Sequence, residues 1–193
     1  MNLIRPAVQK FEKVCKGNSF LFKLYALPYL KTVSKEAKLG EITKSDKVLN
    51  IGCGALPFTS FYLNKLTGAS IIAVDIDEKA VNEARDLLLK LEISEEEILP
   101  VNLSALEAVE KFDFNKVVAA LQTEGKEELL EAIKEKADKK AIVIDFIIRE
   151  PRSGFVNQYD NISFNKLNNY KAKKASQNFP TFDKSISIKL GAS

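Results

Sequence analysis

The sequence of 193 residues contains no histidine. This absence excludes Ser–His–Asp and Cys–His nucleophilic systems, together with most zinc and non-haem iron sites, which use imidazole ligands. Any proton transfer must therefore use Asp, Glu, Tyr, Lys or solvent. Alkyl transfer from a sulfonium is compatible with this restriction, because its leaving group is a neutral thioether and positioning and desolvation supply much of the rate.

Cysteines and long apolar runs are also scarce. The two cysteines, Cys15 and Cys53, lack the spacing of a metal site, so we predict no metal and a reduced, cytoplasmic protein. No apolar run approaches the roughly 18–20 residues that a membrane span needs. Charged residues are scattered through residues 1–22, which argues against a secretory signal. We therefore expect no membrane partner.

The net charge is small but unevenly distributed. The whole chain carries +3, with +6 on residues 1–45, −8 on residues 46–150 and +5 on residues 151–193. The basic ends either frame an acidic small substrate, contact RNA phosphates or form a solvated lysine-rich surface. The total is too low to indicate nucleic acid, so we expect a small-molecule substrate. The length suffices for one globular core, and the sequence leaves the oligomeric state open.

The most informative stretch begins with a short apolar run and a glycine turn. Residues 48–51 are typical of a buried parallel strand, and Gly52 ends it. Gly52 and Gly54, separated by one residue, allow a sharp turn and a close approach of the backbone to a ligand. Pro57 suits the first position of a following helix. These residues predict a strand, a turn and a helix.

A second apolar run, residues 71–74, predicts the next strand and ends at Asp75, 23 residues after Gly52. Ligands of open α/β sheets lie over the carboxyl ends of such strands, where an acid accepts hydrogen bonds from ribose hydroxyls. The unit therefore predicts a nucleoside site. A dinucleotide site is disfavoured because Pro57 occupies the third glycine position of the fingerprint. The alternative without function is a tight turn in a generic doubly wound domain, with Asp77 as a helix cap.

The runs Asn-Ile-Gly-Cys-Gly at residues 50–54 and Ala-Val-Asp-Ile-Asp at residues 73–77 resemble motifs I and II of the class I methyltransferase superfamily. The resemblance implies S-adenosylmethionine as cofactor, with the glycine turn at its methionine end, Asp75 on its ribose and Asn102 near its adenine. The cofactor-binding residues implied in this way are Gly52, Cys53, Gly54, Ala55, Asp75, Ile76, Asn102, Leu103 and Leu121.

We predict that residues 1–45 form helices that cover a site on the sheet. Residues 46–193 are expected to form a Rossmann-like domain. Val8, Phe11 and Val14 form an apolar stripe, and Asn18 or Ser19 is placed to cap the next helix. That helix should be interrupted at Pro28 and resume as far as Gly40.

The rest of the chain alternates strands with helices and predicts an α/β fold. We expect a seven-stranded, mostly parallel sheet with an antiparallel last strand and helices on both faces. Asp77 should cap a helix after the second strand, and another helix should follow at residues 126–139. The remaining strands are expected at residues 98–101, 117–121, 141–148, about 170–175 and 184–190.

The predicted strand ends also suggest the substrate. The fourth strand is not followed by Asp/Asn-Pro-Pro-Tyr, the tetrad of enzymes that methylate planar amide or adenine nitrogens, which argues against that class of target. Arg149, just past the fifth strand, and Arg152 are placed to receive a substrate carboxylate, or else are surface residues.

Several segments resemble the nicotianamine synthases, a branch of the same superfamily. The specific element is Leu-Pro-Phe-Thr-Ser at residues 56–60; the run at residues 118–122, Pro28-Tyr29 ahead of Glu36, and a looser tail add to it. The resemblance implies transfer of the 3-amino-3-carboxypropyl group of S-adenosylmethionine. Tyr29 would then lie beside that group and Arg149 beside an acceptor carboxylate, while Glu36 or Glu12 would replace a carboxylate of the longer family N-terminus.

The sequence thus predicts an S-adenosylmethionine-dependent transferase that acts on a small metabolite, with Tyr29 and Arg149 as the catalytic candidates. Methyl transfer is the default, and aminocarboxypropyl transfer is the alternative. A non-catalytic protein that binds S-adenosylmethionine is a further alternative, because the chain has no histidine and few acids at the site. A dehydrogenase is the remaining and weakest candidate.

Overall fold

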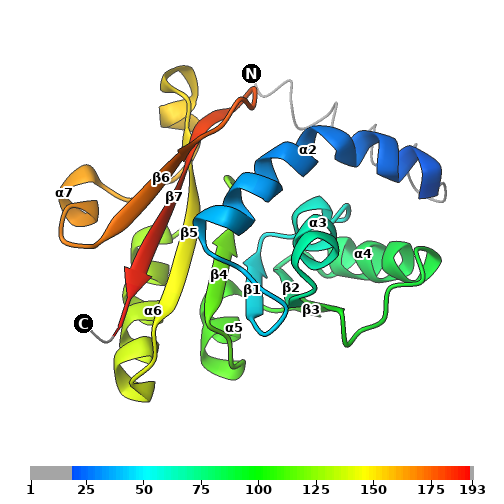
Figure 1. Cartoon of the computed structure of the whole chain (residues 1–193), viewed down its shortest axis with the longest axis horizontal. Helices are drawn as coiled ribbons and strands as arrows, with labels where there is room; N and C mark the ends of the chain where they lie inside the picture. Colours follow the sequence, from blue (N-terminus) through cyan, green and yellow to red (C-terminus); the bar gives the residue numbers. More distant parts are fainter. Residues whose placement is uncertain (1–18, 192–193) are drawn as a thin grey trace.

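A computed structural model describes residues 19–191 and contains one seven-stranded sheet (Figure 1). The strand order is β3-β2-β1-β4-β5-β7-β6, and β7 runs antiparallel to both of its neighbours. The predicted α/β sheet, mostly parallel with an antiparallel last strand, is confirmed. The strands are β1 (Lys47–Ile51), β2 (Ser70–Asp75), β3 (Ile98–Asn102), β4 (Lys116–Ala119), β5 (Ile144–Pro151), β6 (Ala172–Ser176) and β7 (Phe182–Leu190).

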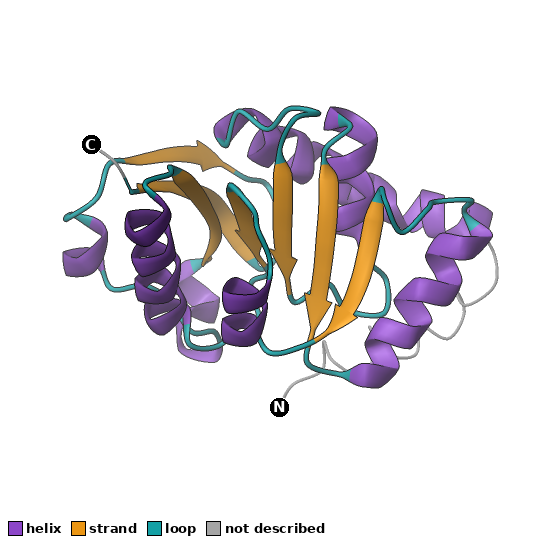
Figure 2. Ribbon diagram, turned by 90° about the horizontal axis from the view of Figure 1, so that it is seen from below, coloured by secondary structure: helices purple, strands orange, loops and turns teal. Residues whose placement is uncertain are grey.

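Helices cover both faces of the sheet, as Figure 2 shows. Alternate residues of a strand point to opposite faces, so Val117 and Ala119 pack into the core beneath α5 and α6, whereas Val118 packs into the core beneath α2, α3 and α4. The helices are α2 (Ser19–Leu39), α3 (Phe58–Thr67), α4 (Glu78–Lys90), α5 (Ala105–Lys111), α6 (Lys126–Lys140) and α7 (Phe164–Leu167), with a 3₁₀ helix η1 (Ser153–Gln158).

The strand order reverses between β1 and β4. The chain moves outward from β1 to β2 and β3, then returns to place β4 on the other side of β1. The connections that leave the carboxyl ends of β1 and β4 therefore diverge to opposite faces. In open α/β sheets this divergence creates the crevice in which ligands bind.

The glycine turn after β1 is fixed to the neighbouring strand. The amides of Gly52 and Cys53 both donate to the carbonyl of Val74, at 2.8 and 3.0 Å. Gly52 and Gly54 have φ of +75° and +66°, which residues with a Cβ rarely adopt. Pro57 is the N-cap of α3 and not its first helical residue, one position earlier than predicted.

The N-terminal helix differs from its prediction at one position. Helix α2 continues through Pro28. A proline removes one intrahelical hydrogen bond, but the helix does not end there. The predicted stripe at residues 8–14 and the cap at Asn18 lie outside the described residues. Between residues 19 and 191, no helix is long and apolar enough to cross a membrane.

The fifth strand lies further along the chain than predicted. Ala141 caps α6 in the left-handed conformation, with φ of 51°, so the strand starts only at Ile144 and runs to Pro151. Arg149 consequently lies inside β5, opposite Ser185 of β7, and not beyond the strand end. Strand β4 ends at Ala119, which leaves Leu121 in the following loop.

Candidate functional site

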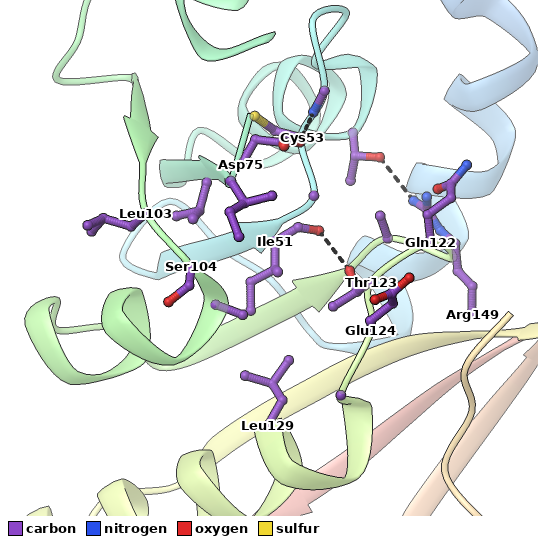
Figure 3. Close-up of a pocket in the computed structure, with 18 of the residues that line it drawn as sticks. Ile51, Cys53, Asp75, Leu103, Ser104, Gln122, Thr123, Glu124, Leu129 and Arg149 are labelled. Atoms are coloured by element: carbon purple, nitrogen blue, oxygen red, sulfur yellow. Dashed lines mark hydrogen bonds between the residues drawn. The ribbon is translucent and has the colours of Figure 1, made fainter. Parts of the chain in front are cut away.

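A cavity of about 690 Å³ opens at the carboxyl ends of β1, β2 and β4. Figure 3 shows Leu103 and Ser104 on one side of it and Gln122 and Arg149 on the opposite side, with Ile51 between them. Among the residues predicted from the sequence, eight line this cavity: Tyr29, Gly52, Cys53, Gly54, Asp75, Ile76, Leu103 and Arg149. The other three, Ala55, Asn102 and Leu121, are not part of its lining.

Asp75 and the glycine turn are joined directly. Oδ2 of Asp75 accepts a hydrogen bond from the Gly54 amide at 2.8 Å, and Oδ1 accepts one from the Asp77 amide at 3.1 Å. A Cβ at Gly54 would meet no atom within 4 Å, whereas a Cβ at Gly52 would lie 3.0 Å from that of Ala120. Gly54 therefore borders open space within the cavity, while Gly52 is packed against the start of the loop after β4.

The end of β2 is held by the side chain of Asn102. Its amide donates to the carbonyls of Asp75 and Ile76, at 3.0 and 2.9 Å. These bonds fix the orientation of both residues while Asn102 itself stays outside the cavity lining. Ile76 is 79% exposed although it is large and apolar, and it shares the cavity wall with Leu103. The two residues form an apolar wall beside the carboxylate, suited to a flat heterocycle.

Cys53 also lines the cavity but is not a nucleophile. Its side chain is buried, and burial together with the negative charge of Asp75 raises the pKa of its thiol to about 12. The reactive form of cysteine is the thiolate, which is negligible at neutral pH for such a group. Within the described part of the chain, no cluster of three or more acidic or sulfur ligands is placed to hold a metal ion.

The loop between β4 and α6 forms the far wall, with Gln122, Thr123 and Glu124 lining the cavity. Lys126, which is fully buried, holds this loop in place through hydrogen bonds. The Lys126 ammonium donates to the carbonyls of Leu121, Thr123 and Asp160. Burial lowers its pKa to about 8, so it is still protonated at pH 7 and uses all three of its N–H donors.

Arg149 reaches the cavity from β5 and is held by an acid on α2. Its Nε and Nη2 donate to Oε1 and Oε2 of Glu36, each at 2.8 Å. Nη2 also donates to Oγ1 of Thr59 at 3.0 Å. Burial opposes the positive charge, but the attraction and hydrogen bonding of Glu36 outweigh it, and the pKa of Arg149 is raised. Arg152 does not line the cavity, and its Nη2 donates a hydrogen bond to the carbonyl of Phe179.

Glu36 does not face the cavity. Its side chain is 0% exposed, and its two oxygens accept hydrogen bonds from Arg149 and Ser185. Glu36 is therefore not exposed to the cavity, and its role as a reacting carboxylate stays a prediction that its burial disfavours. Glu12, the other candidate for that role, lies outside the described residues.

Tyr29 stands beside Arg149 on the same wall. Its ring packs against those of Phe58 and Phe179, with centroids 5.0 and 4.9 Å away. Burial raises the pKa of Tyr29, although the nearby Arg149 acts in the opposite direction. The phenol is therefore protonated at neutral pH and is available as a hydrogen-bond donor, not as a phenolate base.

After β3 the sequence predicted Leu103 but not the three lining residues that follow it. Ser104, Ala105 and Leu106 line the cavity, at the start of the unpredicted helix α5. The signal was present, because Ser104 and Glu107 form a capping box, a pattern that can be recognised in a sequence. Phe58 and Thr59 also line the cavity, and both belong to the Leu-Pro-Phe-Thr-Ser run.

Comparisons with known proteins agree with this architecture. Residues 29–174 match the sequence model of the family described as ribosomal protein L11 methyltransferase (PrmA). No curated protein matches the chain significantly. The cavity, the glycine turn and the strand-end acid all fall within the matched segment.

Among solved structures, a glutamate-to-glutamine mutant of MtNAS in complex with S-adenosylmethionine is similar over 96% of this chain and 72% of its own, with 15% identity and a TM-score of 0.77. MtNAS in complex with MTA and tNA shares 16% identity over 95% of this chain and 69% of its own, with a TM-score of 0.71. An S-adenosylmethionine-dependent O-methyltransferase from Thermotoga maritima shares 14% identity over 84% of this chain and 66% of its own, with a TM-score of 0.64. At these identities the likeness concerns the fold.

Proposed function

The chain belongs to the PrmA methyltransferase family and uses S-adenosylmethionine as its cofactor, and from this premise we propose that it transfers a methyl group to a small metabolite. The observation that carries the proposal is the division of the cavity. Asp75, which is hydrogen-bonded to Gly54, lies apart from Arg149 (Figure 3), and the lining residues Tyr29 and Arg149 come from α2 and β5. At about 690 Å³, the cavity has room for a nucleoside and a second small molecule.

The residues near the glycine turn fit the cofactor. Asp75 has a free lone pair on each oxygen beyond its bonds to the backbone, and these accept hydrogen bonds from the two ribose hydroxyls. Ile76 and Leu103 cover the two sides of the adenine, which explains why so large an apolar side chain as Ile76 is exposed. Gly54 leaves space for the methionine portion, since nothing lies within 4 Å of where its Cβ would be. Cys53 and Ala55 complete the turn.

Asn102 and Leu121 act indirectly in this proposal. Asn102 holds the backbone of Asp75 and Ile76, so it orients the ribose and adenine contacts. Leu121 provides a carbonyl for Lys126, which holds the loop that carries Gln122 and Thr123. We expect substitutions of these two residues to weaken cofactor binding less than substitution of Asp75 does.

S-adenosylmethionine supplies an alkyl group on a positively charged sulfur, whose carbon–sulfur electron pair leaves with the sulfur as a neutral thioether. The chain's own contribution is to bind, orient and exclude water. A lone pair of the acceptor forms the new bond to the transferred carbon, and the proton of the acceptor passes to solvent. Tyr29 donates a hydrogen bond to the bound acceptor, and Arg149 receives an acceptor carboxylate through its remaining N–H donors. Because Cys53 stays protonated, we expect direct transfer without a covalent enzyme intermediate.

A second candidate is transfer of the 3-amino-3-carboxypropyl group. It is favoured by the contacts of the Leu-Pro-Phe-Thr-Ser run, the element that resembles the nicotianamine synthases. Phe58 of this run packs on Tyr29, and Thr59 accepts a hydrogen bond from Arg149. The run therefore supports the two residues that the resemblance places beside the transferred group and the acceptor.

One experiment distinguishes the two reactions. The protein is incubated with S-adenosylmethionine and a panel of amines, amino acids, phenols and purified ribosomal protein L11, and the nucleoside product is identified by mass spectrometry. S-adenosylhomocysteine with a small acceptor supports the proposal, and methylthioadenosine supports the second candidate. Product formation with L11 alone, or binding of S-adenosylmethionine without turnover on any acceptor, would contradict transfer to a small metabolite.

A further inference from the structure

We propose that Glu36 is a positioning residue that orients Arg149 so that its remaining N–H donors recognise a carboxylate in the cavity. The proposal rests on the proposed function and extends it by naming the group that the α2 and β5 wall selects. That carboxylate belongs either to the methionine portion of the cofactor or to the acceptor. The chemistry is the same in both cases.

The first argument is the geometry of the guanidinium. Glu36 occupies Nε and Nη2 as a bidentate fork, and Thr59 takes a second hydrogen bond from Nη2. Nη1 makes no hydrogen bond to any residue whose side chain the structure describes, and Arg149 lines the cavity although only 5% of it is exposed. A guanidinium is planar, so fixing one edge also fixes the direction of the other donors.

The second argument is that Glu36 has no freedom to move. It is fully buried, and its Oε1 also accepts a hydrogen bond from Oγ of Ser185 at 2.8 Å. Ser185 in turn accepts from Nε2 of Gln177 at 3.0 Å. Since Ser185 is the register partner of Arg149 across β5 and β7, the carboxylate is held between α2 and both strands.

The third argument is energetic. A buried pair of opposite charges adds little to the free energy of unfolding, because the loss of hydration largely cancels the attraction between the charges. A pair of apolar residues would fasten α2 to the sheet equally well. The bidentate pair does what apolar residues cannot, because it sets the plane of a guanidinium that also lies 5.3 Å from the centre of the Phe182 ring.

The experiment compares Glu36→Gln and Glu36→Asp with the wild type. Glutamine cannot accept both hydrogen bonds of the fork, whereas aspartate keeps the charge but draws the guanidinium away from the cavity. Asp145→Asn is the matched control, because Asp145 forms a largely buried pair with Lys116 at 2.6 Å and neither residue lines the cavity. Thermal unfolding of each variant measures the purely structural cost.

Two calorimetric titrations identify the source of the carboxylate. The first compares S-adenosylmethionine with decarboxylated S-adenosylmethionine. The second adds free amino acids and their carboxamides to protein saturated with S-adenosylhomocysteine. In one of these titrations, we expect Glu36→Gln to lower the affinity for the ligand that carries the carboxylate by about tenfold or more. The affinity for the matching decarboxylated or amide ligand should be unchanged. Glu36→Asp should fall between Glu36→Gln and the wild type, and Asp145→Asn should match the wild type.

The proposal is overturned if folded Glu36 variants keep the wild-type ratio of affinities in both titrations, or if the wild type itself prefers the carboxylate in neither. Glu36 would then only fasten α2 to the sheet. If Glu36→Gln does not fold, Glu36→Asp decides, since it retains the buried charge. Failure of the proposed function looks different, because it appears in the product assay, as product formed with L11 alone or as no turnover on any acceptor, and not as an unchanged ratio of affinities in the Glu36 variants.

Discussion

Replacing Asp75 by alanine should abolish tight binding of S-adenosylmethionine while the fold survives. The carboxylate uses one lone pair of each oxygen for the amides of Gly54 and Asp77, which leaves one on each for a ribose hydroxyl. A hydrogen bond to a charged group contributes about 1.5–3 kcal/mol. Losing two of them should raise the Kd by about 100-fold or more.

The measurement is calorimetric titration with S-adenosylmethionine, paired with thermal unfolding. Asp75→Asn keeps one acceptor for Gly54 but loses the charge, so its Kd should lie between those of the wild type and Asp75→Ala. The control is Asp46→Asn. Asp46 also fixes a turn, accepting from the Thr43 amide and from Nδ2 of Asn115, each at 2.6 Å, but it precedes β1 at the other end of the sheet.

Asp46→Asn should therefore lower the melting temperature without changing the Kd, whereas Asp75→Ala, which also releases the amides of Gly54 and Asp77, should raise the Kd and lower the melting temperature. An Asp75→Ala protein that is folded and binds S-adenosylmethionine within about threefold of the wild type would refute the assignment of this carboxylate to the ribose. Equal losses of affinity in Asp46→Asn and Asp75→Ala would refute it as well, because they would indicate a general effect on folding.

Three further outcomes are expected. Gly54→Ala should fold with a loss of about 1–2 kcal/mol from its positive φ, yet bind no S-adenosylmethionine by calorimetry, because the added Cβ points into open cavity space. Burial lowers the pKa of Lys126 from 10.5 to about 8. Between these two pH values the unfolded chain binds more protons than the folded protein. The contribution of Lys126 to the free energy of unfolding should therefore rise with pH across this window, by about 3 kcal/mol. Urea unfolding from pH 7 to 10 should show this rise in the wild type relative to Lys126→Met, and equal slopes would contradict it. Cys53, with a thiol pKa of about 12, should resist iodoacetamide at pH 8 in the folded protein, as peptide mass spectrometry can check; rapid alkylation would show that the thiol is not buried.

The sequence was most informative where a local pattern decides the structure. The turn with Gly52 and Gly54 follows from conformations that residues with a Cβ avoid, and Asp77 is confirmed as a helix cap that accepts from the amides of Lys79 and Ala80. Apolar runs indicated strands β1 to β5, because parallel strands covered on both faces require such runs, whereas β6 is polar and largely exposed.

The errors arose where distant contacts decide the structure. Residues 141–143 are as apolar as a strand requires, but Ala141 caps α6 and the amide of Ile142 bonds back to Ala137, so β5 starts later. The pairing of Glu36 with Arg149 joins residues 113 positions apart, and no local pattern indicates it. Arg149, which the sequence predicted as a site residue, is thus also part of a buried ion pair that forms only when α2 packs on the sheet.

The most direct test of the account is a crystal structure of the protein with S-adenosylmethionine. We expect the nucleoside to lie over Gly54, with both ribose hydroxyls within hydrogen-bonding distance of the Asp75 carboxylate and the sulfonium facing Tyr29 and Arg149. A cavity without the nucleoside at saturating concentration, or a nucleoside bound away from Asp75, would contradict it.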